Sequence, residues 1–215
     1  MPGLTITQII SGAEGTYEGN LKAYFKIIFE NASNLANPYH NLRHMLYVTE
    51  QCYCGASRHH IKPRDFRNLL VSALFHDFNH SGSINGHDDL EIEMAIRALR
   101  KYILPEDVLF IRYIEDDIRA TQFPHIVNES VMSLNAKILR DSDISQGLDD
   151  EYLQQIVFGL GKEMRITPRE MLQMQEKFLS RIEFASAWGK VKFEPRRLQR
   201  INEVKTLLEM LEEGE

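Results

Sequence analysis

The histidines of this 215-residue chain gather in one part of the sequence, since seven of the eight lie between residues 40 and 87. His40 and His44 are four residues apart, so on a helix both imidazoles would point from one face. His76 and Asp77 follow an apolar run at residues 69–75. Burying such an ionisable pair is costly unless each group is compensated, and a divalent cation would compensate both. The pattern therefore favours a metal site.

A further acidic pair, Asp141 and Asp143, stands near the end of another amphipathic segment. With His44, His76 and Asp77, one of these aspartates would complete a set of two imidazoles and two carboxylates. Such mixed ligands suit Mn, Mg, Fe, Co, Ni or Zn, and not a structural thiolate site. Helical spacing does not choose between the two aspartates. Taken singly, each motif also has a structural interpretation: a histidine pair beside a core, a capping carboxylate, or a solvated turn.

The ordered set His…His-Asp…Asp resembles the HD-domain superfamily of metal-dependent phosphohydrolases, over about residues 38–148. Segment 39–44 (Tyr-His-Asn-Leu-Arg-His) and segment 76–85 (His-Asp-Phe-Asn-His-Ser-Gly-Ser-Ile-Asn) are similar to the metal-site signatures of cyclic-nucleotide phosphodiesterases. Segment 118–125 (Ile-Arg-Ala-Thr-Gln-Phe-Pro-His) and segment 139–145 (Leu-Arg-Asp-Ser-Asp-Ile-Ser) instead resemble a bacterial branch of HD phosphohydrolases. The resemblance implies an all-α bundle of the HD-domain or phosphodiesterase type.

The chain departs from the phosphodiesterase pattern at several positions. Tyr47 stands where that pattern has an aspartate, and Ser81 stands where it has a proline. Its purine-clamping glutamine has only Gln173 and Gln175 as candidates, and the chain is shorter than such catalytic domains. The resemblance therefore supports the metal site more strongly than it supports cyclic-nucleotide specificity.

The resemblance implies that His44, His76, Asp77 and Asp143 hold a first divalent metal, with Asp77 able to bridge to a second. Asp143 is preferred to Asp141 because the sequence Asp143-Ile144-Ser145 matches the Asp-Leu-Ser form of the family. One or two ions, drawn from Mn, Mg, Fe, Co, Ni and Zn, are therefore expected.

Catalytic roles are implied for Asp77, His40 and His80. His40 would act as a general acid on the leaving oxygen, since an imidazole titrates near neutral pH; the alternative is a hydrogen bond that only supports a ligand. His80, four residues after His76, would contact the water of a second metal or the phosphate.

Cationic side chains near the motifs are candidates to contact the substrate phosphate. We expect one or two of them to do so, and the others to be solvated. His125 is a candidate phosphate or second-metal contact, or else a loop residue, whereas His59, His60 and His87 are interpreted as surface residues. The basic candidates are Arg43, Arg119, Lys137 and Arg140.

The elements that must position these residues are helices, because apolar residues recur at spacings of three and four along the chain. Helices are expected at about residues 21–29, from after Pro38 past Val48, 63–76, 90–104, 105–118 and 129–141, and from near Asp149, Thr167 and Glu194 onward. The second of these would carry His40 and His44 on one face. We expect one helical domain over residues 1–215, with the HD core at about 38–148 and flanking helices at 1–37 and 149–215.

Composition narrows the protein class. The formal net charge is −6, which gives no general attraction to nucleic acid. Cys52 and Cys54 are too close in sequence for an unstrained mutual disulfide, which suggests a reducing compartment. The sequence shows no secretory signal and no apolar run of the roughly 20 residues that span a bilayer. We therefore expect a cytoplasmic protein with no membrane partner, and a homodimer is left open.

The leading functional hypothesis is a metal-dependent phosphohydrolase that cleaves a small-molecule phosphate mono- or diester, a nucleotide above all. One alternative is a di-iron oxygenase of the same superfamily, with His80 and His125 as additional ligands. The other is a regulatory module that binds metal or nucleotide without turnover.

Overall fold

The structure, a computed structural model, describes residues 4–82 and 88–212, and within these ranges it contains helices and no strand. The all-α prediction is therefore confirmed. The α-helices are α1 (Ile6–Ser11), α2 (Lys22–Asn31), α3 (Leu42–His59), α4 (Pro63–Phe75), α5 (Asp88–Tyr102), α6 (Ile111–Arg119), α7 (Leu134–Ile144), α8 (Gly161–Met164), α9 (Pro168–Arg181) and α10 (Ala187–Glu212). Between them lie the 3₁₀ turns η1 (Ala13–Gly15), η2 (Pro105–Phe110), η3 (Glu129–Val131) and η4 (Ser145–Leu148), and the π-helical segment η5 (Leu153–Leu160).

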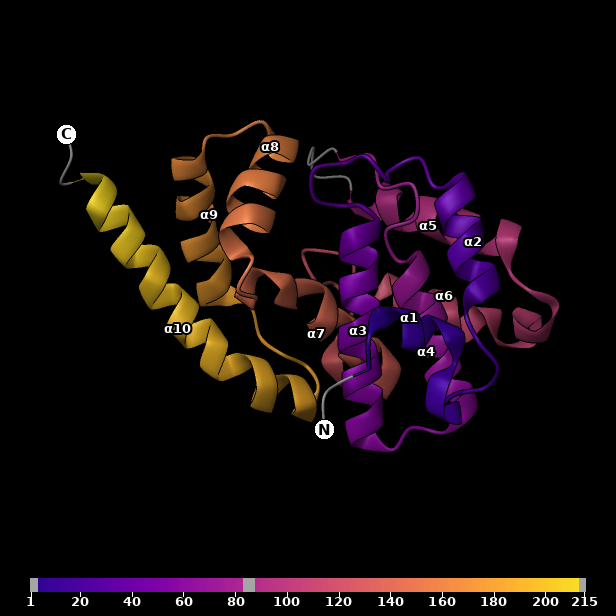
Figure 1. Ribbon diagram of the computed structural model, residues 1–215. Helices are drawn as coiled ribbons and strands as arrows, with labels where there is room; N and C mark the ends of the chain where they lie inside the picture. The colour runs from indigo at the N-terminus through magenta and orange to yellow at the C-terminus, as the bar shows by residue number, and fades with distance from the viewer. Residues whose placement is uncertain (1–3, 83–87, 213–215) are drawn as a thin grey trace.

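Helices α3 and α4 pack against one another, and α6 and α7 pack on this pair. The shorter α1 and α2 and the helix α5 surround it on the outside (Figure 1). Every residue of α4 from Phe66 to Phe75 is buried, which explains why its sequence is apolar nearly all round. Because the surrounding helices hold α4 in place, its C-terminal end has a fixed position, and the residues that follow it are fixed as well.

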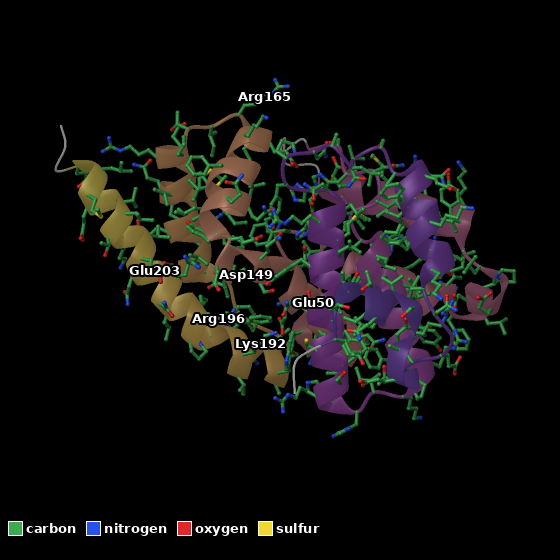
Figure 2. The ribbon with its side chains drawn as sticks, in the orientation of Figure 1. Glu50, Asp149, Arg165, Lys192, Arg196 and Glu203 are labelled. Carbon is green, nitrogen blue, oxygen red and sulfur yellow. The ribbon has the colours of Figure 1, made fainter. Side chains whose placement is uncertain are left out.

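The C-terminal part of the chain, η5 and α8 to α10, lies beside this group (Figure 1). Helix α10 contacts α9, α3, α7 and η4. Lys192 of α10 donates a hydrogen bond to Gln51 Oε1 of α3 at 2.5 Å. Burial raises the pKa of Glu50 on α3, and the positive charge of Lys192 partly counteracts this rise (Figure 2). Polar contacts thus join α10 to the helix that carries His44.

Several helix boundaries differ from those expected. Helix α7 begins only at Leu134, after the separate turn η3, and it continues to Ile144, so Asp141 and Asp143 both lie within it. Helix α10 begins at Ala187 and runs through Pro195, which is exposed, so water can reach the carbonyl group that proline leaves unpaired. The expected helix at 105–118 is divided into η2 and α6, and Val108 of η2 is 47% exposed. The helix expected from near Thr167 is α9, and Thr167 caps it in a capping box with Glu170.

No helix within the described ranges is both long and apolar enough to cross a membrane. Cys52 and Cys54, both on α3, are free thiols, and Cys52 is fully buried. Cys52 therefore acts as a packing residue.

Candidate metal centre

His44 lies in the first turn of α3. The helix is capped by Asn41, whose side-chain oxygen accepts hydrogen bonds from the backbone N–H groups of Arg43 and His44. His40 precedes the cap, so the expectation that His40 and His44 share a helix face was wrong. The two rings still lie near each other, with centroids 5.9 Å apart, because the chain turns sharply before the helix.

His76 and Asp77 stand at the C-terminal end of α4, where His76 is the capping residue. Asn79 takes a left-handed conformation with φ of 65°, which turns the chain away from the helix axis. His80 therefore lies in a loop, and the helical spacing assumed between His76 and His80 does not exist. The buried end of α4 places His76 and Asp77 at the centre of the molecule, and the turn at Asn79 brings His80 back toward His40.

Asp141 and Asp143 of α7 have different surroundings. Asp143 Oδ1 lies 3.0 Å from His44 Nε2 and 3.4 Å from His76 Nε2. The Asp141 carboxylate is fully buried elsewhere and accepts hydrogen bonds from the N–H groups of Ala185 and Ser186 and from the Ser186 hydroxyl. All the oxygens of Asp141 are thus used to bind the chain just before α10.

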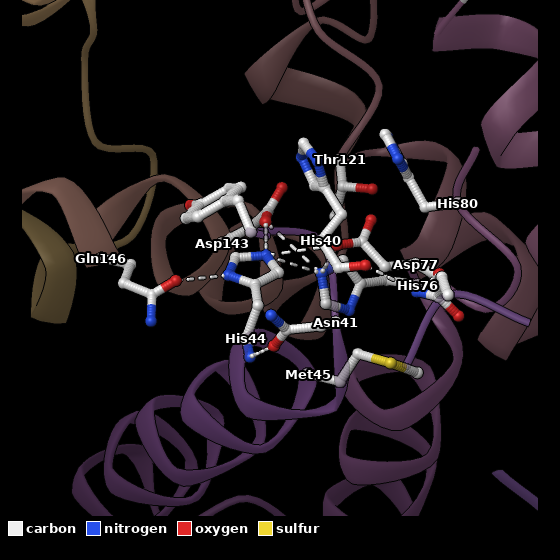
Figure 3. A network of polar contacts seen from close by, with 12 residues as sticks. His40, Asn41, His44, Met45, His76, Asp77, His80, Thr121, Asp143 and Gln146 are labelled. Carbon is white, nitrogen blue, oxygen red and sulfur yellow. Dashed lines mark hydrogen bonds and ion pairs between the residues drawn. The ribbon is translucent and has the colours of Figure 1, made fainter. Parts of the chain in front are cut away.

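Four side-chain atoms converge from three helices (Figure 3). His44 Nε2 and His76 Nε2 are 3.3 Å apart, and Asp77 Oδ2 lies 3.3 Å from the first and 3.4 Å from the second. With Asp143 Oδ1, they form a cluster in which His44 and His76 are almost fully buried. The structure therefore brings together the two imidazoles and two carboxylates that the sequence suggested as one ligand set.

The protons of the two histidines point away from this cluster. His76 Nδ1 lies 2.7 Å from the carbonyl oxygen of Ala73, and His44 Nδ1 lies 2.7 Å from Gln146 Oε1. Because both partners only accept hydrogen bonds, each Nδ1 carries a proton, so a ring in its neutral form presents a bare Nε2 lone pair to the cluster. Lone pairs of two imidazoles and two carboxylates then face one another, an arrangement that only a cation can stabilise.

The electrostatics of the cluster also favour a positive charge between these four side chains. Asp77 Oδ2 is buried and has no hydrogen-bond partner. Burial disfavours the charged form of His76, but Asp77 and Asp143 outweigh burial and hold the pKa of His76 well above its usual value. Burial likewise disfavours the ionised form of Asp143, yet His44 and His76 lower its pKa. The site attracts positive charge, and a proton on His76 or a metal ion would supply it.

A second group, His40, His80 and Glu163, lies beside the first and has a different character. Glu163 Oε1 is 2.5 Å from His40 Nδ1, while Glu163 Oε2 accepts from the N–H groups of Tyr39 and His40. The rings of His40 and His80 stack with centroids 3.7 Å apart, and His80 Nδ1 accepts from the N–H of Gly82. Hydrogen bonds already satisfy these groups, so this group orients an imidazole without requiring a metal.

Glu163 was not anticipated from the sequence. It lies on α8, 123 residues from His40, and nothing local distinguishes it from a solvated glutamate. Burial opposes its ionisation, but the hydrogen bond with His40 lowers its pKa. The same contacts raise the pKa of His40 against the effect of its burial. The result is a charged or strongly polarised pair next to the metal-ligand cluster.

A cavity of about 360 Å³ opens beside both clusters. His40, His80 and Asp143 line its polar side, and Phe123 and Phe178 contribute to its apolar side. The remaining lining residues are Tyr39, Asp88, Pro124, Ile144, Gly147, Ile156, Leu160, Met164, Met174 and Gln175. An organic molecule in this cavity would contact Asp143, one of the four residues of the metal-ligand cluster, together with His40 and His80.

None of the four basic candidates for phosphate contact lines this cavity. Arg43 pairs with Glu151, Arg119 with Glu93, and Lys137 with Glu129. Arg140 is buried, and its guanidinium donates to the carbonyl oxygen of Val127. Within the described ranges, no lysine or arginine lines the cavity.

The other histidines are placed as follows. His125 is partly buried, its Nδ1 lies 3.2 Å from the Gln122 carbonyl oxygen, and burial together with the Arg140 charge lowers its pKa to about 4. It does not line the cavity. His60 is exposed and His59 half-buried, away from the cluster, and His87 lies outside the described residues.

No protein-family model matches the chain, and no curated protein matches it. The chemistry of the site must therefore be inferred from its own residues.

Proposed function

We propose that this protein is a metal-dependent phosphohydrolase that cleaves a small phosphate mono- or diester, a nucleotide above all. The observation that carries the proposal is the set of four potential ligand atoms on His44, His76, Asp77 and Asp143, which face one another at 3.0–3.4 Å. These residues would hold a divalent ion. Two nitrogen and two oxygen ligands leave positions open for substrate and water, as in catalytic metal sites.

A divalent ion at this position would lower the pKa of water toward neutrality and polarise a phosphoryl oxygen. The protein's own contribution is to fix the ligands. Gln146 and the Ala73 carbonyl hold the tautomers of His44 and His76, and Asn41 holds the start of α3. Such supporting hydrogen bonds orient ligands and increase their basicity.

His40 is the proton donor in this proposal. It lines the cavity, and Glu163 holds its ring through Nδ1, which leaves Nε2 as the atom that can exchange a proton with substrate. Glu163 is a positioning residue, because it acts on the substrate only through His40. The contacts with Glu163 and Asp77 raise the pKa of His40 against the effect of its burial, and this favours the protonated ring that a general acid requires.

The cavity favours a substrate with a flat organic group and a single phosphate. Phe123 and Phe178 supply aromatic walls, and Gln175 Oε1 is buried without a hydrogen-bond partner. This oxygen can accept a hydrogen bond from a nucleobase amino or imino group. The lack of cationic lining residues in the described part of the chain argues against a triphosphate group.

The test is a metal analysis followed by a panel of phosphate mono- and diesters assayed with Mn, Mg, Fe, Co, Ni and Zn. We expect activity with at least one ester, lost in His76→Ala. Glu163→Gln should retain the metal but lower kcat by about 10²-fold, because general acid catalysis contributes about that much. Activity that survives His76→Ala would refute the proposal.

The two alternative functions give different results in the same experiments. A di-iron oxygenase would lose its activity without oxygen. The proposed phosphohydrolase does not use oxygen, so we expect its activity to be unchanged under anaerobic conditions. A regulatory module would bind metal and nucleotide, as thermal shifts would report, but would form no product from any ester.

A further inference from the structure

A cavity larger than the one beside the metal-ligand cluster lies elsewhere in the described structure. It has a volume of about 710 Å³ and lies between the end of α3, the start of α4, the end of α6 and the start of α7. None of the residues that form the metal-ligand cluster or its cavity lines it. Nothing in the proposed phosphohydrolase function uses it.

Three buried polar atoms without a hydrogen-bond partner belong to residues that line this one cavity: Asn68 Oδ1, Asp117 Oδ2 and His59 Nε2. Asn68 and Asp117 are only 2% and 3% exposed. An unpaired buried acceptor is costly, and two oxygens of this kind beside one cavity are rare without a ligand. The oxygens call for N–H or O–H donors.

The surroundings of Asp117 indicate what kind of donor group a ligand in this cavity would carry. Asp117 Oδ1 accepts a hydrogen bond from the Ser133 hydroxyl at 2.8 Å, and none of the ion pairs within the described ranges includes Asp117. Burial, with a smaller contribution from the charge of Asp116, raises the pKa of Asp117 to about 7, although hydrogen bonds from the side chains of Ser133, Asn135 and Ser72 act in the opposite direction. A buried carboxyl group without a counter-ion is stabilised by a ligand that brings positive charge.

The exposed residues that line the cavity include an apolar group. Tyr113, Val131 and Leu134 have exposed fractions of 66%, 77% and 40%, whereas the exposed lining residues Lys62, Asp65 and Asp116 are charged. A metal ion alone would not fill such a volume, and the groups able to hold a metal in the described part of the chain do not include Asp117. The occupant is therefore organic, with one cationic end and one apolar or aromatic end.

We propose that this cavity is a second binding site, separate from the metal centre, for an amphipathic organic cation such as an amidine, a guanidine or a primary amine on an aromatic or apolar group. Its cationic N–H donors bind Asp117 Oδ2 and Asn68 Oδ1. Its apolar part packs on Tyr113, Val131 and Leu134.

The probe is benzamidine, an aromatic ring with a planar cationic group that carries several N–H donors. Benzamide is its neutral analogue of nearly the same shape, and benzoate is its anionic analogue. Binding of each is measured by isothermal titration calorimetry at pH 8, where Asp117 is ionised. We expect benzamidine to bind at least about tenfold more tightly than benzamide, since a charge-assisted hydrogen bond is about twice as strong as a neutral one. Benzoate should not bind.

Variants locate the site. Asp117→Asn should weaken benzamidine binding at least about tenfold, because it removes the counter-charge. Tyr113→Ala, at an exposed position that should not affect folding, should weaken it about threefold through loss of ring contact. Asp89→Asn, which changes an exposed carboxylate that does not line this cavity, and Phe178→Ala, which alters the cavity at the metal centre, should leave binding within about twofold.

Equal binding of benzamide and benzamidine would overturn the proposal, as would binding that persists in Asp117→Asn or no binding at all. The last outcome would indicate that a protonated Asp117 donates to a neighbouring acceptor within the protein. If Asp117→Asn does not fold, the comparison of the three probes on the wild-type chain and the Tyr113→Ala variant decide the matter. None of these results depends on phosphohydrolase activity.

Discussion

Asp141 and Asp143 show how two identical residues on one helix acquire different roles. Asp143 faces two histidines, whereas the carboxylate of Asp141 binds the start of α10, where N–H groups are unpaired and the helix dipole favours an anion. Gly189 permits this approach, since a Cβ atom there would lie 2.2 Å from Asp141 Oδ2. Sequence spacing could not separate the two aspartates, because α10 lies more than 40 residues further along the chain.

Substitution of the two aspartates should therefore separate metal binding from stability. Asp143→Asn removes a ligand charge and should weaken divalent metal binding at least about tenfold, with little effect on the unfolding of the metal-free protein. Asp141→Asn removes charged hydrogen bonds in a buried site and should lower the free energy of unfolding by about 2–3 kcal/mol. Metal titration and urea unfolding of both variants measure these effects. Loss of metal binding in Asp141→Asn with retention in Asp143→Asn would reverse the assignment.

At the scale of helices, apolar periodicity predicted the all-α class and the approximate place of most elements. The errors came from local groups that end helices. Asn41 caps α3 and leaves His40 outside it, and Asn79 in a left-handed conformation leaves His80 outside α4. Both histidines still line the site. Glu163 of α8 holds His40 there, although the two residues are 123 positions apart in the sequence. No periodic pattern within one segment can predict such a contact.

The junction of α2, α4 and η2 contains a buried ion cluster that the sequence also did not reveal. Asp107 lies in the first turn of η2, is fully buried and accepts hydrogen bonds from Arg67, Arg64 and the Tyr24 hydroxyl. The two Asp107–Arg67 contacts are 2.7 and 2.8 Å long, and they join η2 to the central helix. Removing one partner leaves an uncompensated buried charge.

Asp107→Asn should therefore lower the free energy of unfolding by about 3–5 kcal/mol. Burial alone would raise the pKa of Asp107, but Arg67 and Tyr24 lower it below its usual value. A depressed pKa contributes stability above the unfolded pKa of about 3.9, and this contribution is lost as pH falls through the folded value. Urea unfolding between pH 7 and pH 3 should show an acid-dependent loss in the wild-type chain that is smaller in Asp107→Asn. Equal acid dependence in both would show that other carboxyl groups are responsible.

At the scale of the whole molecule, the metal-ligand cluster joins segments that are far apart in the sequence. His44 comes from α3, His76 and Asp77 from the end of α4, and Asp143 from α7, and these helices pack directly on one another. The net charge of −6 includes the two carboxylates of the cluster. Without a cation, their repulsion opposes the packing of the helices that carry them, so metal binding and folding should be coupled.

This coupling predicts that a divalent metal stabilises the entire fold. A ligand present at about 100 times its Kd adds about 2.7 kcal/mol to the free energy of unfolding. For a chain of this size, that corresponds to a rise in Tm of about 5–10 °C. Differential scanning calorimetry of the metal-loaded and chelator-treated protein measures the difference. His76→Ala, which lacks one ligand, should melt at the same temperature with and without chelator, whereas an equal chelator effect in that variant would place the stabilising ion elsewhere in the molecule.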